Sequence, residues 1–418
     1  MLYIAILVVL IVRFSFFILY GTSRNVGFLI PLFLECLFIY PFVLVDFIGL
    51  EWSFYALITL YIPIICIQVG LIPLLDLPLT KVVFEFKFRH ILFFVFLSIV
   101  FYGVGVVSNF SQADLFNFSI SNYLQISNNS ALDRYSGEQN LSLLYKIGSI
   151  FAYFSAFMLG FILAVNKSNI TSPLRYTWAL IVLLFFIALL DSFLMAARAG
   201  MMMMTFCFIS SYIIVSQVKE SGRAISLSTK TILKLAFALI VVFLFFLIIQ
   251  IFRGGKEDFD LIGILSHLIT WFVGHIPVFS IWIENIDLSE QPQLGVNTFA
   301  GISDLIGFKE RNIGIYEGVN IGNGRISNIY TALRPIIEDI TIFGMAVLYV
   351  SFGLSISVLI KTRNIKTKKL FTFLCIAITI FLLWSFVTSI FVYNTILVAL
   401  FIFSFVSYYS VRIKIETL

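Results

Sequence analysis

Charged residues are scarce in this chain of 418 residues. Asp, Glu, Lys and Arg together make up 12% of it, whereas 61% of the residues are apolar and the mean hydropathy is +1.05. A soluble protein of this length holds about a quarter charged residues and roughly 45–50% apolar ones. The deficit excludes a soluble enzyme, a nucleic-acid binder and a secreted disulfide scaffold. The composition is that of a polytopic membrane protein.

Cysteine and histidine are also scarce, with four and three residues, and nucleotide-binding motifs are missing. The four cysteines all lie within apolar runs, so we expect neither a disulfide framework nor a metal cluster. No GxxxxGK[ST] motif occurs, and no GxGxxG motif follows a strand pattern. The longest predicted cytoplasmic segment, around residues 218–230, is too short to fold as a catalytic domain. We therefore expect no chemistry driven by cytosolic ATP or sugar nucleotides, and no cofactor.

Long apolar runs dominate what is present. A helix crosses about 30 Å of hydrocarbon in roughly 20 residues, and windows of that length predict eleven membrane spans. Their ranges are 2–20, 27–50, 53–75, 90–109, 147–165, 176–195, 199–217, 231–251, 339–360, 370–389 and 391–411. No basic residue precedes the first apolar run, so it is expected to be an uncleaved span and not a signal peptide. The chain is predicted to be an all-α polytopic membrane protein with a single membrane domain, 1–418.

The basic residues predict the orientation of these spans. If the gap after the first span is cytoplasmic, 17 of the 27 basic residues fall in cytoplasmic gaps and the C-terminal tail. The N-terminus is then outside, and the outer side carries a Ser/Asn-rich loop, 110–146, and a long loop, 252–338. If the segment 261–283 within the long loop spanned the membrane, every basic cluster that follows it would lie on the outer side. We therefore expect that segment to lie on the membrane surface or to re-enter, with Trp271 and Trp282 at head-group depth.

Three arginines are expected at the outer membrane–water boundary. Arg198 follows the sixth span in the small-residue link AARAG, Arg253 ends the eighth span, and Arg334 precedes the ninth. The planar guanidinium group binds phosphate oxygens bidentately, and this boundary is the depth of a lipid-linked pyrophosphate. Alternatively, an arginine at a span end reaches lipid phosphate or pairs with a nearby acid.

The run TALRPIIED places two acids directly after Arg334. Pro335 suits the first turn of a helix, so Glu338 and Asp339 fall in the first turns, where the helix dipole favours negative charge. That capping role is one interpretation. The other is that one of the two acids is a general base beside Arg334. Tyr330 is suited to stacking on a sugar or orienting a phosphate, although interfacial tyrosines are also common in membrane proteins.

Other polar residues within apolar runs have simpler interpretations. His267 and His275 are eight residues apart, so a continuous helix would bring them to nearly one face, as a catalytic base or as hydrogen-bonded structural residues. Arg13 in the first span is expected to pair with Glu35 in the second. No chain of acids crosses the bilayer, as a proton-coupled pump would need.

The layout resembles that of the oligosaccharide repeat-unit polymerases of bacterial surface polysaccharides, the Wzy-type O-antigen or capsule polymerases. The resemblance covers the number of spans, the two outer loops and the position of the larger loop before the last spans. The segment SNIYTALRPIIEDITIFG, residues 327–344, is similar to the end of that larger loop in such polymerases. The link AARAG, residues 196–200, is similar to a small-residue and arginine turn after a central span. The fold implied is a GT-C-like membrane glycosyltransferase architecture.

The resemblance implies a metal-independent glycosyltransferase of the bacterial inner membrane with its active site facing the periplasm. Such an enzyme transfers the growing glycan from undecaprenyl pyrophosphate to the terminal sugar of a new undecaprenyl-pyrophosphate-linked repeat unit. Glu338 or Asp339 would deprotonate the acceptor hydroxyl. The residues implied to bind substrate and pyrophosphate are Arg198, Arg253, Arg325, Tyr330 and Arg334. A co-polymerase that regulates chain length is the implied protein partner.

Two alternative functions remain open at this stage. An O-antigen ligase uses the same donor, and would be expected to depend on a histidine in the outer loop. A flippase or other transporter of lipid-linked oligosaccharides needs charged groups along a central cavity. The sequence concentrates its unusual charges at one face, which favours the polymerase.

Overall fold

The apolar runs fold as helices, because a helix satisfies every backbone polar group within the segment itself. The computed structural model describes residues 2–20, 26–75, 80–86, 88–110, 120–136, 141–166, 173–195, 197–219, 247–249, 261–286, 292–308 and 316–417. In its first half the helices are α1 (Leu2–Tyr20), α2 (Val26–Phe38), α3 (Pro41–Phe47), α4 (Phe54–Leu71), α5 (Phe88–Ser108), α7 (Ile120–Ser136), α8 (Leu143–Asn166), α9 (Pro173–Leu194) and α10 (Arg198–Lys219). In its second half they are α12 (Leu261–Val273), α13 (His275–Asn285), α14 (Ala300–Leu305), α15 (Leu333–Lys361), α16 (Ile365–Trp384) and α17 (Asn394–Ser410), with short 3-10 helices η1 (Ile72–Leu75) and η2 (Ile390–Val392).

The helices are those of a multi-pass membrane protein. Eight helical segments among the described residues are long and apolar enough to cross a membrane, or nine if the bent pair α12–α13 is one span. Two further apolar helices are shorter than the length required of a span: α17, and residues Ile6–Ser15 of α1. Every predicted span except 231–251 overlaps a helix; that range lies outside the described residues apart from 247–249. The prediction of an all-α polytopic membrane protein is confirmed at this level.

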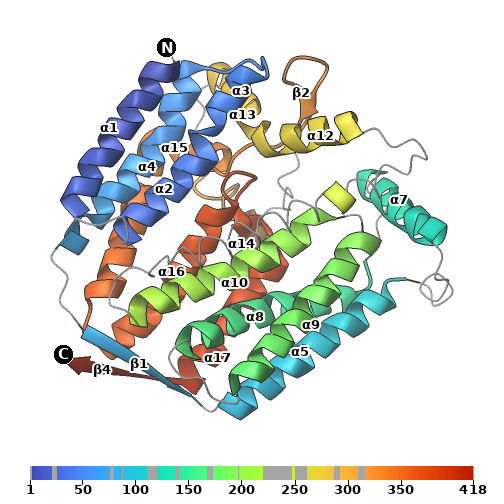
Figure 1. Ribbon diagram of the computed structural model, residues 1–418, viewed down its shortest axis with the longest axis vertical. Helices are drawn as coiled ribbons and strands as arrows, with labels where there is room; N and C mark the ends of the chain where they lie inside the picture. Colours follow the sequence, from blue (N-terminus) through green and yellow to red (C-terminus); the bar gives the residue numbers. More distant parts are fainter. Residues whose placement is uncertain are drawn as a thin grey trace.

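Close backbone contact holds the bundle together (Figure 1). Helix α8 packs against α5, α10 and α17, while α4 packs along α15. A Cβ atom added at Gly70 of α4 would lie 2.9 Å from the Cα of Gly353 in α15. Small residues allow such approach, and they drive helix association in lipid, where burial of apolar surface supplies little net force.

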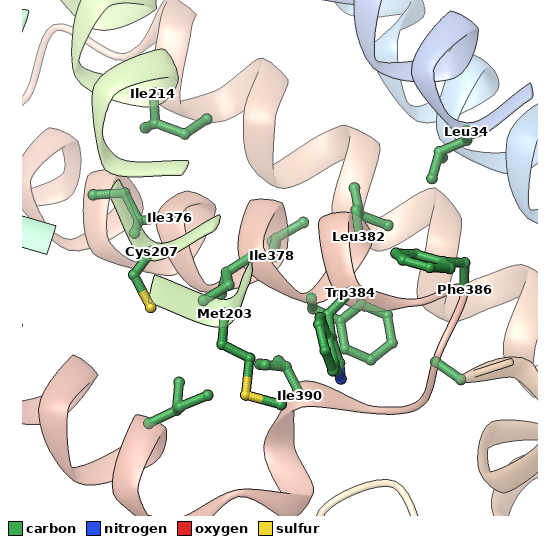
Figure 2. Close-up of a cluster of buried hydrophobic side chains, with 14 of the residues drawn as sticks. Leu34, Met203, Cys207, Ile214, Ile376, Ile378, Leu382, Trp384, Phe386 and Ile390 are labelled. Carbon is green, nitrogen blue, oxygen red and sulfur yellow. The ribbon is translucent and has the colours of Figure 1, made fainter. Parts of the chain in front are cut away.

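A buried apolar cluster joins α10 to α16 near the centre of the molecule. Met203 and Cys207 of α10 lie beside Ile376 and Ile378 of α16, and Leu382 follows further along α16 (Figure 2). Trp384 closes the cluster at the end of α16, where its ring lies 6.2 Å from that of Phe386. The segment after α16 starts from this cluster, and its Ser385 carbonyl accepts from the N–H of Ala332, directly before α15.

An ion pair links α1 and α2 within the apolar region. Arg13 donates through Nε to Glu35 Oε2 at 3.0 Å and through Nη2 to Glu35 Oε1 at 2.5 Å. Tyr40 adds a third hydrogen bond to the same carboxylate, at 3.3 Å. The predicted pairing of Arg13 with Glu35 is confirmed. The bidentate geometry compensates the two charges where water is scarce.

Two small sheets, which the sequence analysis did not predict, lie at opposite ends of α15. Strand β1 (Thr80–Phe86) pairs antiparallel with β4 (Val411–Thr417), near the end of α15 that contacts η1. Strands β2 (Val319–Asn320) and β3 (Ile326–Ser327) form a hairpin just before α15 begins. In Figure 1 this hairpin projects at the same end of the molecule as α12 and α3, far from β1 and β4.

The segments predicted as outer loops contain further helices. Helix α7 lies within 110–146, and α12, α13 and α14 lie within 252–338. Helices α12 and α13 are bent by 47° relative to each other, at a break at Gly274. The backbone at Gly274 lies against the side chain of Ser327, where a Cβ atom would come within 2.8 Å of the Ser327 hydroxyl oxygen. A glycine at this position therefore allows the β2–β3 hairpin to pack closely against the break.

Candidate functional site

The first turns of α15 carry an ion pair that is partly open to solvent. Arg334 donates through Nε to Glu338 Oε1 at 2.9 Å, across one helical turn. The two side chains are 20% and 24% exposed. The spacing i, i+4 brings the side chains together on one face of the helix. Sequence alone therefore anticipates this contact.

Three aromatic rings surround the Arg334 guanidinium group. Its Cζ atom lies 3.9 Å from the ring centroid of Tyr316, 4.2 Å from that of Tyr330 and 5.5 Å from that of Trp282. Tyr316 and Tyr330 flank the β2–β3 hairpin, and their ring centroids are 4.9 Å apart. A cation over an aromatic face is attracted by the ring quadrupole, more strongly where water is excluded. The hairpin and α13 thus hold the guanidinium group in place, and we call these three rings the aromatic clasp.

The clasp leaves much of the hydrogen-bonding capacity of Arg334 unused. Within the described part of the chain, the Nε atom bonds to Glu338 and neither Nη group donates a hydrogen bond. Arginine has five N–H donors, and the two Nη groups carry four of them. Burial raises the pKa of Tyr316, with a smaller contribution from the nearby Glu338 charge, so its hydroxyl stays protonated. The arrangement suits a phosphate group beside Arg334.

Asp339 has a different position from Glu338, although it is the next residue. Its side chain is fully buried, and its two oxygens accept from the backbone N–H groups of Asn297, at 3.1 Å, and Thr298, at 2.6 Å. The Asp339 carbonyl also accepts from the N–H of Leu294, at 3.1 Å. Asp339 therefore supports the loop before α14. Of the two acids that the sequence analysis proposed as the base, Glu338 is the accessible one.

A break in α15 separates these residues from the rest of the helix. Thr341 has φ 64° and ψ 173°, which divides α15 into a short part next to the predicted outer loop, called the outer part, and a long apolar part, called the membrane part. Backbone in such a region costs on the order of 1–3 kcal/mol for a residue with a side chain, and is kept only where the surroundings impose it. The residue at this position is neither glycine nor proline, so the sequence does not predict the break. Arg334, Glu338 and Asp339 all lie on the short outer part.

Arg198 lies against the other half of the bent helix pair. It is the first residue of α10, it is buried, and its Cζ atom lies 5.3 Å from the ring centroid of Trp271 in α12. Arg334 contacts Trp282 of α13 in the same way. Each arginine is thus positioned by a tryptophan of one bent pair, but no contact joins the two arginines directly. Nearby in α9, the Asp191 carboxylate accepts from the hydroxyl groups of Tyr102 and Tyr145.

The other predicted site residues are Arg325, Arg253 and Tyr330. Arg325 lies in the tight turn of the β2–β3 hairpin, and its buried Nη1 atom has no hydrogen-bond partner among the described residues. Arg253 lies outside the described residues. Tyr330 does join the site, through its ring, while its hydroxyl lies 3.5 Å from the carbonyl oxygen of Glu317.

The two histidines do not share a face, because the bend at Gly274 comes between them. His267 is exposed on α12, whereas His275 is buried at the start of α13. The ring nitrogens of His275 lie 3.0 Å from the carbonyl oxygen of Phe272 and 3.1 Å from that of Leu37. The expectation of a common face is wrong. His275 joins α13 to α2 and has no nitrogen left for a substrate.

Tyr316, Trp282 and Asn297 are neighbours of the ion pair that no pattern in the sequence predicts. Asn297 lies close enough for its amide to approach Glu338 Oε2, at 3.5 Å. No periodic pattern connects these residues with α15, since they lie 18 to 52 positions before Arg334 in irregular segments or another helix. Among the described residues, no group of three or more His, Cys, Asp or Glu side chains is placed to hold a metal ion.

Comparison with known proteins adds no relative. The chain matches no protein-family model, no curated protein and no solved structure.

Proposed function

We propose that this protein is a membrane glycosyltransferase of the oligosaccharide repeat-unit polymerase type. It transfers the growing glycan from undecaprenyl pyrophosphate to the terminal sugar of a new undecaprenyl-pyrophosphate-linked repeat unit, at the periplasmic face of the bacterial inner membrane. The observation that carries the proposal is the partly exposed pair of Arg334 and Glu338, in which aromatic rings hold the arginine and, among the described residues, only its Nε atom donates a hydrogen bond. An anion site and a carboxylate base lie side by side.

Contacts between distant segments support the proposed division of the connecting segments into two sides. The predicted outer segments meet one another: the N–H of Ser53 donates to Ser280 Oγ, and Ser389 Oγ donates to the carbonyl of Thr298. The predicted cytoplasmic segments that contain β1 and β4 also pair with each other. Eleven spans with the N-terminus in the periplasm and the C-terminus in the cytoplasm accommodate both groups of contacts. A GT-C-like architecture is part of the same proposal.

The reaction needs a base, an anion site and no external energy source. The acceptor hydroxyl oxygen attacks the anomeric carbon of the donor sugar, the bond from that carbon to the pyrophosphate oxygen breaks, and undecaprenyl pyrophosphate leaves. Glu338 takes the hydroxyl proton, which contributes roughly 10²–10⁴-fold in rate for a positioned base. Arg334 stabilises the charge that develops on the leaving pyrophosphate. The aromatic clasp keeps the guanidinium group oriented while both substrates exchange.

Arg198 is proposed as a second anion site of the same enzyme. Both substrates carry a pyrophosphate, and Arg198 lies against the Trp271 half of the bent pair that also contacts Arg334 through Trp282. Arg253 and Arg325 retain their proposed pyrophosphate-binding roles from the family resemblance. A chain-length-regulating co-polymerase is the proposed protein partner.

The ligase alternative receives no support from the histidines. His275 is buried, with both ring nitrogens against carbonyl oxygens, and the exposed His267 lies on the other side of the bend. In the described residues the Arg334–Glu338 pair joins a carboxylate to a cation at a partly exposed position, whereas His267 lies on α12, on the other side of the bend.

A complementation experiment tests the proposal. A strain that lacks the protein receives the wild type, Arg334→Ala, Glu338→Gln or the control Lys414→Ala, whose ion pair with Glu85 lies on the opposite sheet. We expect long glycan chains with the wild type and the control, and single repeat units on the gel with the two site variants, all at equal protein level. Long chains with both site variants would exclude the assigned roles.

The null strain itself separates the functions. Loss of even single capped repeat units would indicate a flippase. Accumulation of long chains that stay on undecaprenyl pyrophosphate would indicate a ligase. Single capped units without long chains are the result expected of a missing polymerase.

A further inference from the structure

The segment around α14 exposes a row of large apolar side chains. They are Leu294, Phe299, Ile302, Leu305, Ile306 and Phe308, and Ile306 is 73% exposed. Three of the residues between them face inward: Ala300 and Ser303 are buried, and Gly301 packs against η2 and α17. Exposed apolar patches of this kind mark contact with another molecule or with a membrane. The segment 294–308 is called the α14 segment below.

Contacts with α17 place the α14 segment at the level where that apolar helix begins. Asn394, the first residue of α17, donates through Nδ2 to Asp304 Oδ2 at 2.7 Å. A Cβ atom added at Gly301 would lie 2.6 Å from Asn394 Oδ1 and 3.0 Å from Leu397 Cδ1. The ring of Phe299 stacks on Phe391, with centroids 5.2 Å apart. The α14 segment is therefore docked on the first turn of α17.

The exposed surface of α17 continues towards the α14 segment. Leu397, Phe401 and Phe405 follow one another at intervals of four residues, so they lie along one face of the helix. Phe401 and Phe405 are exposed. Apolar side chains exposed on a membrane helix face lipid, and Leu397, at the upper end of this face, is in contact with Gly301. The α14 segment is therefore packed against the N-terminal end of this lipid-facing helix face.

We propose that the α14 segment is an interfacial membrane anchor whose exposed apolar side chains insert into the outer leaflet. The occupant of the patch is the lipid bilayer, because the α14 segment is docked on the first turn of a helix that exposes Phe401 and Phe405 to lipid, and it therefore lies at the depth where that helix enters the membrane. Apolar side chains on an interfacial segment enter the boundary between head groups and acyl chains. This contact requires only the orientation given above, and its role in the reaction rests on the proposed function.

The anchor is tied directly to the helix that carries the ion pair. The Asp339 carboxylate accepts from the N–H groups of Asn297 and Thr298, and the carbonyls of Glu338 and Asp339 accept from the N–H groups of Gln293 and Leu294. These four hydrogen bonds join the start of the α14 segment to the outer part of α15. The anchor therefore sets the height of Arg334 and Glu338 at the level of lipid phosphate, where a lipid-linked pyrophosphate lies.

A photo-crosslinking experiment tests the anchor. The residue p-benzoylphenylalanine replaces Ile306 in one protein and Ile326 in a matched control, and each full-length protein is reconstituted in phosphatidylethanolamine and phosphatidylglycerol vesicles. Ile326 is also an exposed isoleucine, 70% exposed, but it lies in the β2–β3 hairpin. After illumination we expect phospholipid adducts at position 306 at several times the yield at position 326. Equal yields at the two positions, or adducts at 306 to protein only, would overturn the proposal.

The same crosslink distinguishes failure of the anchor from failure of the proposed function. In an Arg334→Ala background we expect position 306 to label lipid as before, while long glycan chains are lost. Lipid labelling with persistent long chains would leave the anchor standing and remove the enzymatic role of Arg334. If position 306 does not label lipid while long glycan chains are lost, the anchor is excluded and the enzymatic role of Arg334 stands.

Discussion

Asp339 Oδ2 lies 2.6 Å from the backbone nitrogen of Thr298, and this contact joins two segments that are 41 residues apart in the chain. The adjacent Glu338 points instead to Arg334 and is partly exposed. Two neighbouring carboxylates thus have separate tasks, one in holding the α14 segment and one at the candidate site. The predictions below test these tasks separately.

Removal of the Asp339 carboxylate is expected to destabilise the packing of residues 293–298 against α15. In Asp339→Asn one oxygen is replaced by an N–H₂ group that faces a backbone N–H donor. A buried donor without a partner costs about 1–3 kcal/mol. Thermal unfolding in detergent should shift to lower temperature for Asp339→Asn, whereas Glu338→Gln, at the exposed neighbour, should unfold close to the wild type. Equal stability of Asp339→Asn and wild type would contradict the supporting role.

Substitution of Glu338 is expected to affect the reaction and to spare binding. Glu338→Gln keeps the size of the side chain and an oxygen for Arg334 but removes the base. We expect a fall in the transfer rate of roughly 10²–10⁴-fold, with the affinity for a lipid-linked pyrophosphate changed much less. The measurement is the initial rate in proteoliposomes loaded with lipid-linked repeat units. A variant with near wild-type rate would assign the base elsewhere.

The aromatic clasp is expected to depend on rings and not on the hydroxyl of Tyr316. Tyr316→Phe keeps the aromatic face 3.9 Å from the Arg334 guanidinium carbon, whereas Tyr316→Leu removes it. A desolvated cation–π contact contributes about 2 kcal/mol, so the leucine variant should bind pyrophosphate roughly 30-fold more weakly. Binding is measured with undecaprenyl pyrophosphate in detergent. If the phenylalanine variant loses as much affinity as the leucine variant, the hydroxyl group is the important part of the residue.

The pair of Arg13 and Glu35 is expected to show strong coupling. Removing one partner, in Arg13→Met or Glu35→Met, leaves a charge uncompensated between α1 and α2, with an expected loss of about 3–5 kcal/mol. The double variant Arg13→Met/Glu35→Met removes both charges and should recover much of that loss. A thermodynamic cycle built from the four proteins measures the coupling. Additive effects of the two single substitutions would exclude a direct interaction.

The sequence by itself determined the features that depend on local pattern. Apolar runs of sufficient length predict membrane helices because unsatisfied backbone groups are too costly in hydrocarbon, and the helices of the structure overlap those runs. The spacing of Arg334 and Glu338 predicts their contact across one helical turn. The cost of an isolated charge in a span likewise predicts a partner for Arg13. These are statements about residues close in the chain or about the cost of leaving a group without a partner.

Only the tertiary structure decided how Glu338 and Asp339 differ and what surrounds Arg334. Both acids satisfy the same local pattern, but the approach of the 293–298 loop buries one and leaves the other accessible. The bend at Gly274 separates His267 from His275, and the break at Thr341 sets the outer part of α15 apart from the membrane part. The physical reason is that these features arise from packing between segments far apart in the chain, which no helical or strand period encodes.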